Sequence, residues 1–182
     1  MPTCLDAAPP QNRCQCHTRL GRRGLLRLAS GLAAIGLAGG ADASGGDYDA
    51  MLVNCIDPRF TTSSFEYMGS IGLRNKYSQF VIAGGPIGAV HPRFVAWHQA
   101  YWDNLAITLQ LHKIDRVVAL THRDCGAATA AFGADAVRTP QDETAAHTLA
   151  HRAFRASLAL RHPDTSVTTG SMALDGSVQL VT

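Results

Sequence analysis

The stretch Arg116–Gly126, which reads Arg-Val-Val-Ala-Leu-Thr-His-Arg-Asp-Cys-Gly, decides the fold. Its apolar first part predicts a buried strand over 116–121. His122 and Cys125 follow the carboxyl end of that strand, and the Ala-rich segment 126–132 is typical of a helix. A strand that leads through a tight turn into a helix indicates a sheet with helices on its faces.

Apolar runs and helical segments alternate on both sides of this stretch. We expect further strands over 50–55, 79–83, 166–174 and 178–181. We expect helices over 61–75 (capped by Ser63 or Ser64), over 92–113 and from Pro140 until Pro163 ends it, with a turn at 84–88. The predicted fold class is α/β: a mainly parallel four-stranded sheet flanked by helices, with a C-terminal antiparallel edge strand after the Asp175-Gly176 turn.

Composition places this fold in one ordinary domain behind a distinct N-terminal segment. The 182 residues carry a formal net charge of +2. Residues 1–43 hold five Arg and two Asp, a net charge of +3, whereas residues 44–182 hold eleven Lys and Arg against twelve Asp and Glu, a net charge of −1. The domain at 44–182 therefore gives no electrostatic reason to expect a nucleic-acid partner.

The segment 1–43 is typical of an export signal. Adjacent Arg22 and Arg23 precede an uncharged stretch over 28–40, and Ala41-Asp42-Ala43 offers small residues to a signal peptidase. The Arg pair resembles a twin-arginine signal, and an ordinary secretory signal is the alternative. Because the uncharged stretch has 13 residues and about 20 are needed to span a bilayer, we expect no stable membrane anchor. We expect a periplasmic or secreted protein after the signal is removed.

Three metal-ligand side chains are predicted to share one edge of the sheet. Cys55 follows the first predicted strand, and His122 and Cys125 follow the strand at 116–121. The carboxyl ends of parallel strands meet at the same edge, where binding sites collect. Two thiolates and an imidazole suit zinc (Zn²⁺) and leave a fourth position for water. A Cys55–Cys125 disulfide is the alternative in an oxidising compartment.

A carboxylate and a guanidinium accompany the first of these ligands. The segment 55–59 reads Cys-Ile-Asp-Pro-Arg, so Asp57 and Arg59 are two residues apart and can point the same way. The guanidinium would keep the Asp57 carboxylate ionised and fix its orientation. A carboxylate held in this way can accept a hydrogen bond from a metal-bound hydroxide, which makes both residues catalytic candidates.

Cys-x-Asp-x-Arg at 55–59, followed by His-x-x-Cys-Gly at 122–126, resembles the beta class of carbonic anhydrases. The resemblance extends over about residues 51–181. It implies zinc at Cys55, His122 and Cys125, an accompanying Asp57–Arg59 pair, and a homodimer or larger homo-oligomer. It also implies reversible hydration of carbon dioxide to bicarbonate and a proton. Hydrolysis of carbonyl sulfide or carbon disulfide on the same scaffold, and zinc binding without turnover, are the alternatives.

Two further histidines lie four residues apart on the helix that begins at Pro140. Histidines at this spacing could bind a metal, but no Glu follows His147 and the predicted helix has an exposed face, so we expect His147 and His151 to be solvated. The predicted apolar stripe of this helix consists of Ala146, Leu149, Ala150, Ala153, Phe154 and Leu158.

Overall fold

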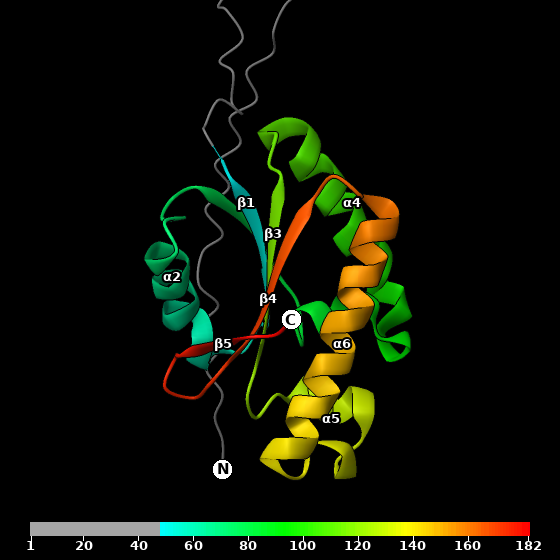
Figure 1. Ribbon diagram of the computed structural model, residues 1–182. Coiled ribbons are helices and arrows are strands. Elements are labelled where there is room, and N and C mark those ends of the chain that lie inside the picture. The colour runs from blue at the N-terminus through cyan, green and yellow to red at the C-terminus, as the bar shows by residue number, and fades with distance from the viewer. Residues whose placement is uncertain (1–47) are drawn as a thin grey trace, which may run out of the picture. The chain divides into compact units, whose positions relative to one another are not determined.

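The computed structural model describes residues 48–182 (Figure 1), so the expected export signal at 1–43 lies outside the described residues. The strands are β1 (Ala50–Asn54), β2 (Tyr77–Val81), β3 (Arg116–His122), β4 (Ser166–Met172) and β5 (Val178–Leu180). The helices are α2 (Thr61–Ser70), α3 (Pro86–Val90), α4 (Val95–His112), α5 (Gly126–Phe132) and α6 (Pro140–Arg161). Short 3₁₀ turns lie at η1 (Pro58–Phe60), η2 (Pro92–Phe94) and η3 (Asp135–Val137).

The strands form one sheet in the order β2-β1-β3-β4-β5. The strands β2, β1, β3 and β4 run parallel, and β5 returns antiparallel to β4 at the edge. The predicted α/β fold class is therefore confirmed. The register pairs Val53 with Ala119, which places the carboxyl ends of β1 and β3 side by side. These ends face α5 and the start of α6 (Figure 1).

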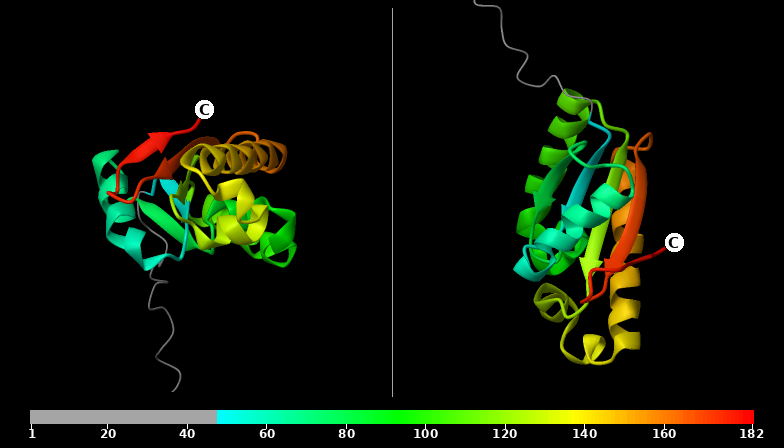
Figure 2. Two further views of the ribbon diagram at one scale, coloured as in Figure 1. Left: turned by 90° about the horizontal axis from the view of Figure 1, so that it is seen from below. Right: turned by 90° about the vertical axis from the view of Figure 1, so that its left-hand side faces the viewer.

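Helices cover both faces of the sheet, because side chains alternate between the two faces along each strand. The long helices α4 and α6 lie on one face and α2 lies on the other, as the two further views show (Figure 2). On the first face, Met51 of β1 packs in one cluster with Tyr101 of α4 and Phe154 of α6. On the second, Leu52 of β1 packs in one cluster with Met68 of α2. The buried sheet gives rigid support to the loops that follow its strands.

The expected cap of the first helix was wrong. Helix α2 begins at Thr61, directly after the 3₁₀ turn η1, and ends at Ser70. Ser64 is therefore inside the helix, where it is buried and its hydroxyl accepts a hydrogen bond from Asn54 Nδ2 at 3.2 Å. A serine hydroxyl can cap the start of a helix or form a hydrogen bond with a residue distant in the chain, and local sequence does not distinguish these two roles.

The turn expected at 84–88 contains a helix. Helix α3 begins at Pro86, whose fixed φ suits the first helical position, and it is too short to show a periodic pattern. The second strand lies at Tyr77–Val81, two residues earlier than expected, and α4 begins at Val95 rather than at 92. Within the described part of the chain, no helix is both long enough and apolar enough to cross a bilayer.

Candidate metal centre

Three ligand-type side chains meet at the carboxyl ends of β1 and β3. Cys55 directly follows β1, His122 is the last residue of β3, and Cys125 directly precedes α5. Their ligand atoms lie within 4.8 Å of one another, and the residues are 8%, 2% and 3% exposed, respectively. Both cysteines are free thiols, so the structure does not contain the alternative disulfide. The result is a buried Cys-His-Cys group that is placed to hold a metal ion.

One hydrogen bond orients the imidazole of His122. Its Nδ1 lies 2.8 Å from the carbonyl oxygen of Arg123, and Nδ1 carries the proton because a carbonyl only accepts. The lone pair is then on Nε2, which is buried and has no hydrogen-bond partner among the described residues. Phe60 packs on the ring, with centroids 4.2 Å apart. A buried nitrogen without a partner is costly, and a bound metal ion would satisfy it.

Cys55 is the thiol of the pair that ionises first. A hydrogen bond from the Cys125 thiol lowers the pKa of Cys55 well below its ordinary value, against the opposing effect of burial. The main-chain N–H of Gly84 also donates to Cys55 Sγ, at 3.2 Å. The same pairing, together with burial, raises the pKa of Cys125. The site therefore favours a thiolate at Cys55, and the thiolate is the form that binds metals.

The N–H of Gly84 reaches the sulfur through a turn that requires glycine at the next position. Gly85 has φ +56° and ψ −120°, a conformation that L side chains rarely adopt. A Cβ at Gly85 would lie 2.7 Å from the Leu120 carbonyl oxygen and 3.1 Å from Asn54 Cα. The sequence pattern predicts only a turn here, so this donor was missed. The glycine pair directly after the second strand was the available signal.

The expected pair of Asp57 and Arg59 is formed. Arg59 Nε lies 3.0 Å from Asp57 Oδ1 and Nη2 lies 2.7 Å from Oδ2, so the guanidinium donates hydrogen bonds to both carboxylate oxygens. These hydrogen bonds lower the pKa of Asp57 to about 2. Arg59 also donates from Nη1 to Asp124 Oδ2 at 2.7 Å and from Nη2 to the Asp124 carbonyl at 3.0 Å. The guanidinium thus links the loop after β1 to the loop after β3, a link that sequence spacing did not indicate.

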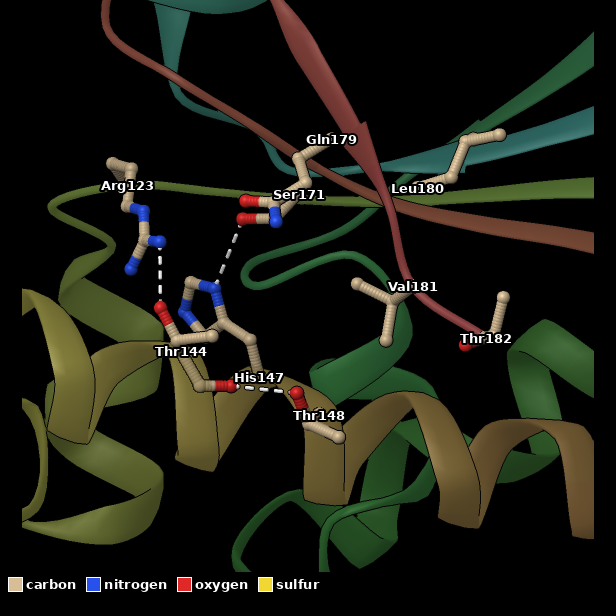
Figure 3. A pocket seen from close by; sticks show the side chains of 9 residues that line it. All are labelled: Arg123, Thr144, His147, Thr148, Ser171, Gln179, Leu180, Val181 and Thr182. Carbon is tan, nitrogen blue, oxygen red and sulfur yellow. Dashed lines mark hydrogen bonds between the residues drawn. The ribbon is translucent and has the colours of Figure 1, made fainter.

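The expectation that His147 and His151 are solvated was wrong. They are 1% and 0% exposed, and burial lowers the pKa of each to about 4. His147 projects from α6 toward the C-terminal strands, with Nδ1 3.3 Å from Ser171 Oγ (Figure 3). His151 Nε2 lies 3.1 Å from Thr121 Oγ1. Polar side chains of β3 and β4 therefore bring these histidines into the buried face of α6, whereas Leu149, expected in that face, is 58% exposed.

Comparison with known sequences gives relatives without an established activity. No protein-family model matches the chain. An uncharacterized protein of Rickettsia conorii is 28% identical over 131 residues, which cover 72% of this chain and 70% of the relative. An uncharacterized protein of Rickettsia bellii is 27% identical over 131 residues, which cover 72% and 80%.

Comparison with solved structures identifies the fold. A structure of tetrameric beta-carbonic anhydrases from Sordaria macrospora aligns with a TM-score of 0.54 at 13% identity, over 76% of this chain and 83% of that chain. The beta-carbonic anhydrase CafA of Aspergillus fumigatus aligns with a TM-score of 0.51 at 13% identity, over 87% and 82%. A carbonic anhydrase from Glaciozyma antarctica aligns with a TM-score of 0.50 at 17% identity, over 91% and 98%. The chain has the fold of the beta-carbonic anhydrases, with a buried Cys-His-Cys group at the carboxyl edge of its sheet.

Proposed function

We propose that the protein is a zinc enzyme that reversibly hydrates carbon dioxide to bicarbonate and a proton. The observation that carries the proposal is the convergence of Cys55, His122 and Cys125 within 4.8 Å, on a fold shared with carbonic anhydrases. The ligand atoms are two sulfurs and one nitrogen. This donor set suits zinc, and three protein ligands leave a position open for catalysis.

The residues present fit a zinc ion. The unpartnered Nε2 of His122 offers a lone pair, and the pKa of Cys55 already favours its thiolate. A zinc ion at this place supplies the Lewis acidity that makes water a nucleophile near neutral pH. Both cysteines and the histidine would hold it, and the Gly84 N–H would stabilise the charge on Cys55.

Asp57 and Arg59 orient the reacting groups in this proposal. With a pKa of about 2, the Asp57 carboxylate is ionised at neutral pH and can accept a hydrogen bond from the attacking O–H group. That bond aims the oxygen lone pair at the carbon of carbon dioxide. Arg59 holds both carboxylate oxygens, which would leave Asp57 free of the metal when zinc is bound. Bicarbonate then leaves, and the released proton passes to buffer.

Stopped-flow hydration of carbon dioxide by the zinc-loaded protein tests this function, with Cys125→Ala as the metal-site control. Hydration by the parent protein and its loss in the variant support the proposal. Hydrolysis of carbonyl sulfide or carbon disulfide without hydration assigns the alternative enzyme activity. One bound zinc per chain without either reaction identifies a zinc-binding protein without turnover.

We also propose that the protein is exported and assembles with copies of itself. The charge pattern of residues 1–43 and the Ala41-Asp42-Ala43 sequence support export to the periplasm or beyond. The tetrameric beta-carbonic anhydrases among the structural neighbours support a homo-oligomer. Light scattering on the purified protein measures the assembly, and a monomer at micromolar concentration would contradict it.

A further inference from the structure

A buried carboxylate of α6 contacts the loop between two of the candidate ligands. Glu143 lies in the first turn of α6 and is 8% exposed. Its Oε1 accepts a hydrogen bond from the main-chain N–H of Asp124 at 2.6 Å. Its Oε2 accepts from Arg123 Nη1 at 3.1 Å. Arg123 and Asp124 are the two residues between His122 and Cys125, so both oxygens of one carboxylate bind this loop.

The loop has a conformation that needs support. Asp124 has φ +57°, in the left-handed region that residues with a side chain rarely adopt. Glu143 holds the Asp124 N–H from one side. Arg59 holds the Asp124 carbonyl and carboxylate from the other side. The turn that carries His122 and Cys125 is therefore fixed between α6 and the loop after β1.

Arg123 is fixed to the start of α6 at more than one point. Its Nη1 also donates to the Pro140 carbonyl at 3.0 Å, and its Nη2 donates to Thr144 Oγ1 at 2.6 Å, the bond drawn between these side chains in Figure 3. The side chains of Arg123 and Glu143 are 25% and 11% exposed. A partly buried, charge-assisted pair is screened less by solvent than a surface pair, so these contacts tie the loop firmly to the helix.

We infer that Glu143 is a positioning residue for the metal centre. It holds the 122–125 loop so that His122 Nε2 and Cys125 Sγ already point at a common place. It acts through the loop rather than as a ligand, because its two oxygens bind Asp124 and Arg123. The inference rests on the proposed metal site and adds a residue to it from a helix that carries none of the three ligands.

A first-turn acidic residue can also serve merely as a favourable charge at the start of a helix. Asp142 provides the matched control, because it lies in the same turn and its side chain contacts Thr139 rather than the loop. Glu143→Ala removes both loop contacts. Glu143→Gln keeps an oxygen that can accept from the Asp124 N–H while it removes the charge. Asp142→Asn removes a first-turn charge alone.

Two measurements on the full chain separate these roles. The first is the rate of zinc transfer from the loaded protein to excess chromophoric chelator. Because partners of metal ligands typically contribute about 10–100-fold to metal affinity, Glu143→Ala should release zinc roughly 10–100 times faster. The rate of zinc release from Glu143→Gln should lie between those of the parent and Glu143→Ala, and the rate from Asp142→Asn should equal that of the parent. The second is hydrogen exchange of the Asp124 amide in the metal-free protein, which should accelerate in Glu143→Ala and remain slow in Asp142→Asn.

Equal zinc release and equal Asp124 exchange in the parent and both Glu143 variants would overturn the inference. If zinc release and Asp124 exchange accelerate as much in Asp142→Asn as in Glu143→Ala, the effect comes from the charge at the helix start, and the inference is overturned as well. If the parent protein binds no zinc, the proposed function fails, and the exchange rates of the metal-free proteins still decide whether Glu143 holds the loop. If Glu143→Ala does not fold, the same comparison is made between Glu143→Gln and Asp142→Asn.

Discussion

Replacing Gly85 by alanine perturbs the turn that brings the Gly84 N–H onto Cys55. The substitution adds one methyl group and changes no charge. Gly85 lies in the turn between β2 and α3, directly after the residue whose N–H donates to Cys55 Sγ. The effect therefore depends on the backbone geometry of this turn and on the space around it.

Two costs add in this variant. A φ of +56° with a ψ of −120° costs a residue with a Cβ about 1–3 kcal/mol. The methyl group would also lie 2.7 Å from the Leu120 carbonyl oxygen, and overpacking of this kind costs about 1–3 kcal/mol more. We expect a loss of about 4 kcal/mol in the free energy of unfolding. For a chain of this size, each kcal/mol lowers the melting temperature by about 2–4 °C, so the expected fall is roughly 8–16 °C.

Gly126→Ala is the matched control beside the other cysteine. Gly126 is the first residue of α5, its φ is not positive, and a Cβ there would meet no atom within 4 Å apart from its chain neighbours and the backbone of its own helix. Alanine favours a helix by up to about 1 kcal/mol over glycine, so this variant should be as stable as the parent or slightly more stable. Urea unfolding of the metal-free proteins, followed by far-ultraviolet circular dichroism, measures both. Metal is left out because its binding to the folded state would mask the difference.

A loss below about 1 kcal/mol for Gly85→Ala, at an unchanged urea dependence, would refute the reasoning, because the chain would then not form the described turn. A loss of equal size for Gly126→Ala would show that the region tolerates no added methyl group. The geometry of the Gly84–Gly85 turn would then not be the cause.

Cys125→Ala should reduce bound zinc from about one ion per chain to none in elemental analysis, because it removes one of three ligands; undiminished zinc would contradict the assignment. Arg59→Ala should keep zinc but lose most hydration activity, because the freed Asp57 carboxylate can coordinate the metal. X-ray absorption should then show an added oxygen ligand, and full activity with an unchanged shell would count against this. Because Arg59 lowers the pKa of Asp57 from 3.8 to about 2, the stability from this pair is complete above the unfolded value and is lost as the pH falls through about 2. Asp57→Asn should therefore flatten the acid side of the urea stability profile, and an unchanged slope would show that the pair contributes nothing. Mass spectrometry of the exported protein should find Ser44 or a close neighbour at its N-terminus, whereas an intact segment 1–43 on an active cytoplasmic enzyme would refute export.

The parts of the fold that depend on short-range patterns could be predicted from the sequence. The apolar run at 116–121 and the small residues at 126–132 each specify their element locally, and the structure has β3 and α5 there. The convergence of Cys55 with His122 follows from topology, since parallel strands bring their carboxyl ends to one edge. Neither step requires knowledge of distant side chains.

The contacts that depend on tertiary partners could not be predicted. Histidines count as polar in a periodicity pattern, yet His147 and His151 are buried because Ser171 and Thr121 provide partners. The role of Glu143 depends on a loop 19 residues earlier in the chain. Local sequence gives Glu143 only the signal of an acidic residue in a first helical turn.

The pairing of β1 with β3 has a consequence for how the chain finds its correct alignment. Val53 lies opposite Ala119, and Cys55 and His122 each lie within three residues of that pair. A slip of one residue between the strands would move Cys55 by about 3.3 Å relative to His122 and turn β1 over in the sheet. Three ligands could not then converge within 4.8 Å. A metal ion held by these residues would therefore stabilise the native register of β1 and β3 and none of the slipped registers. Metal binding would in this way favour the correctly paired sheet.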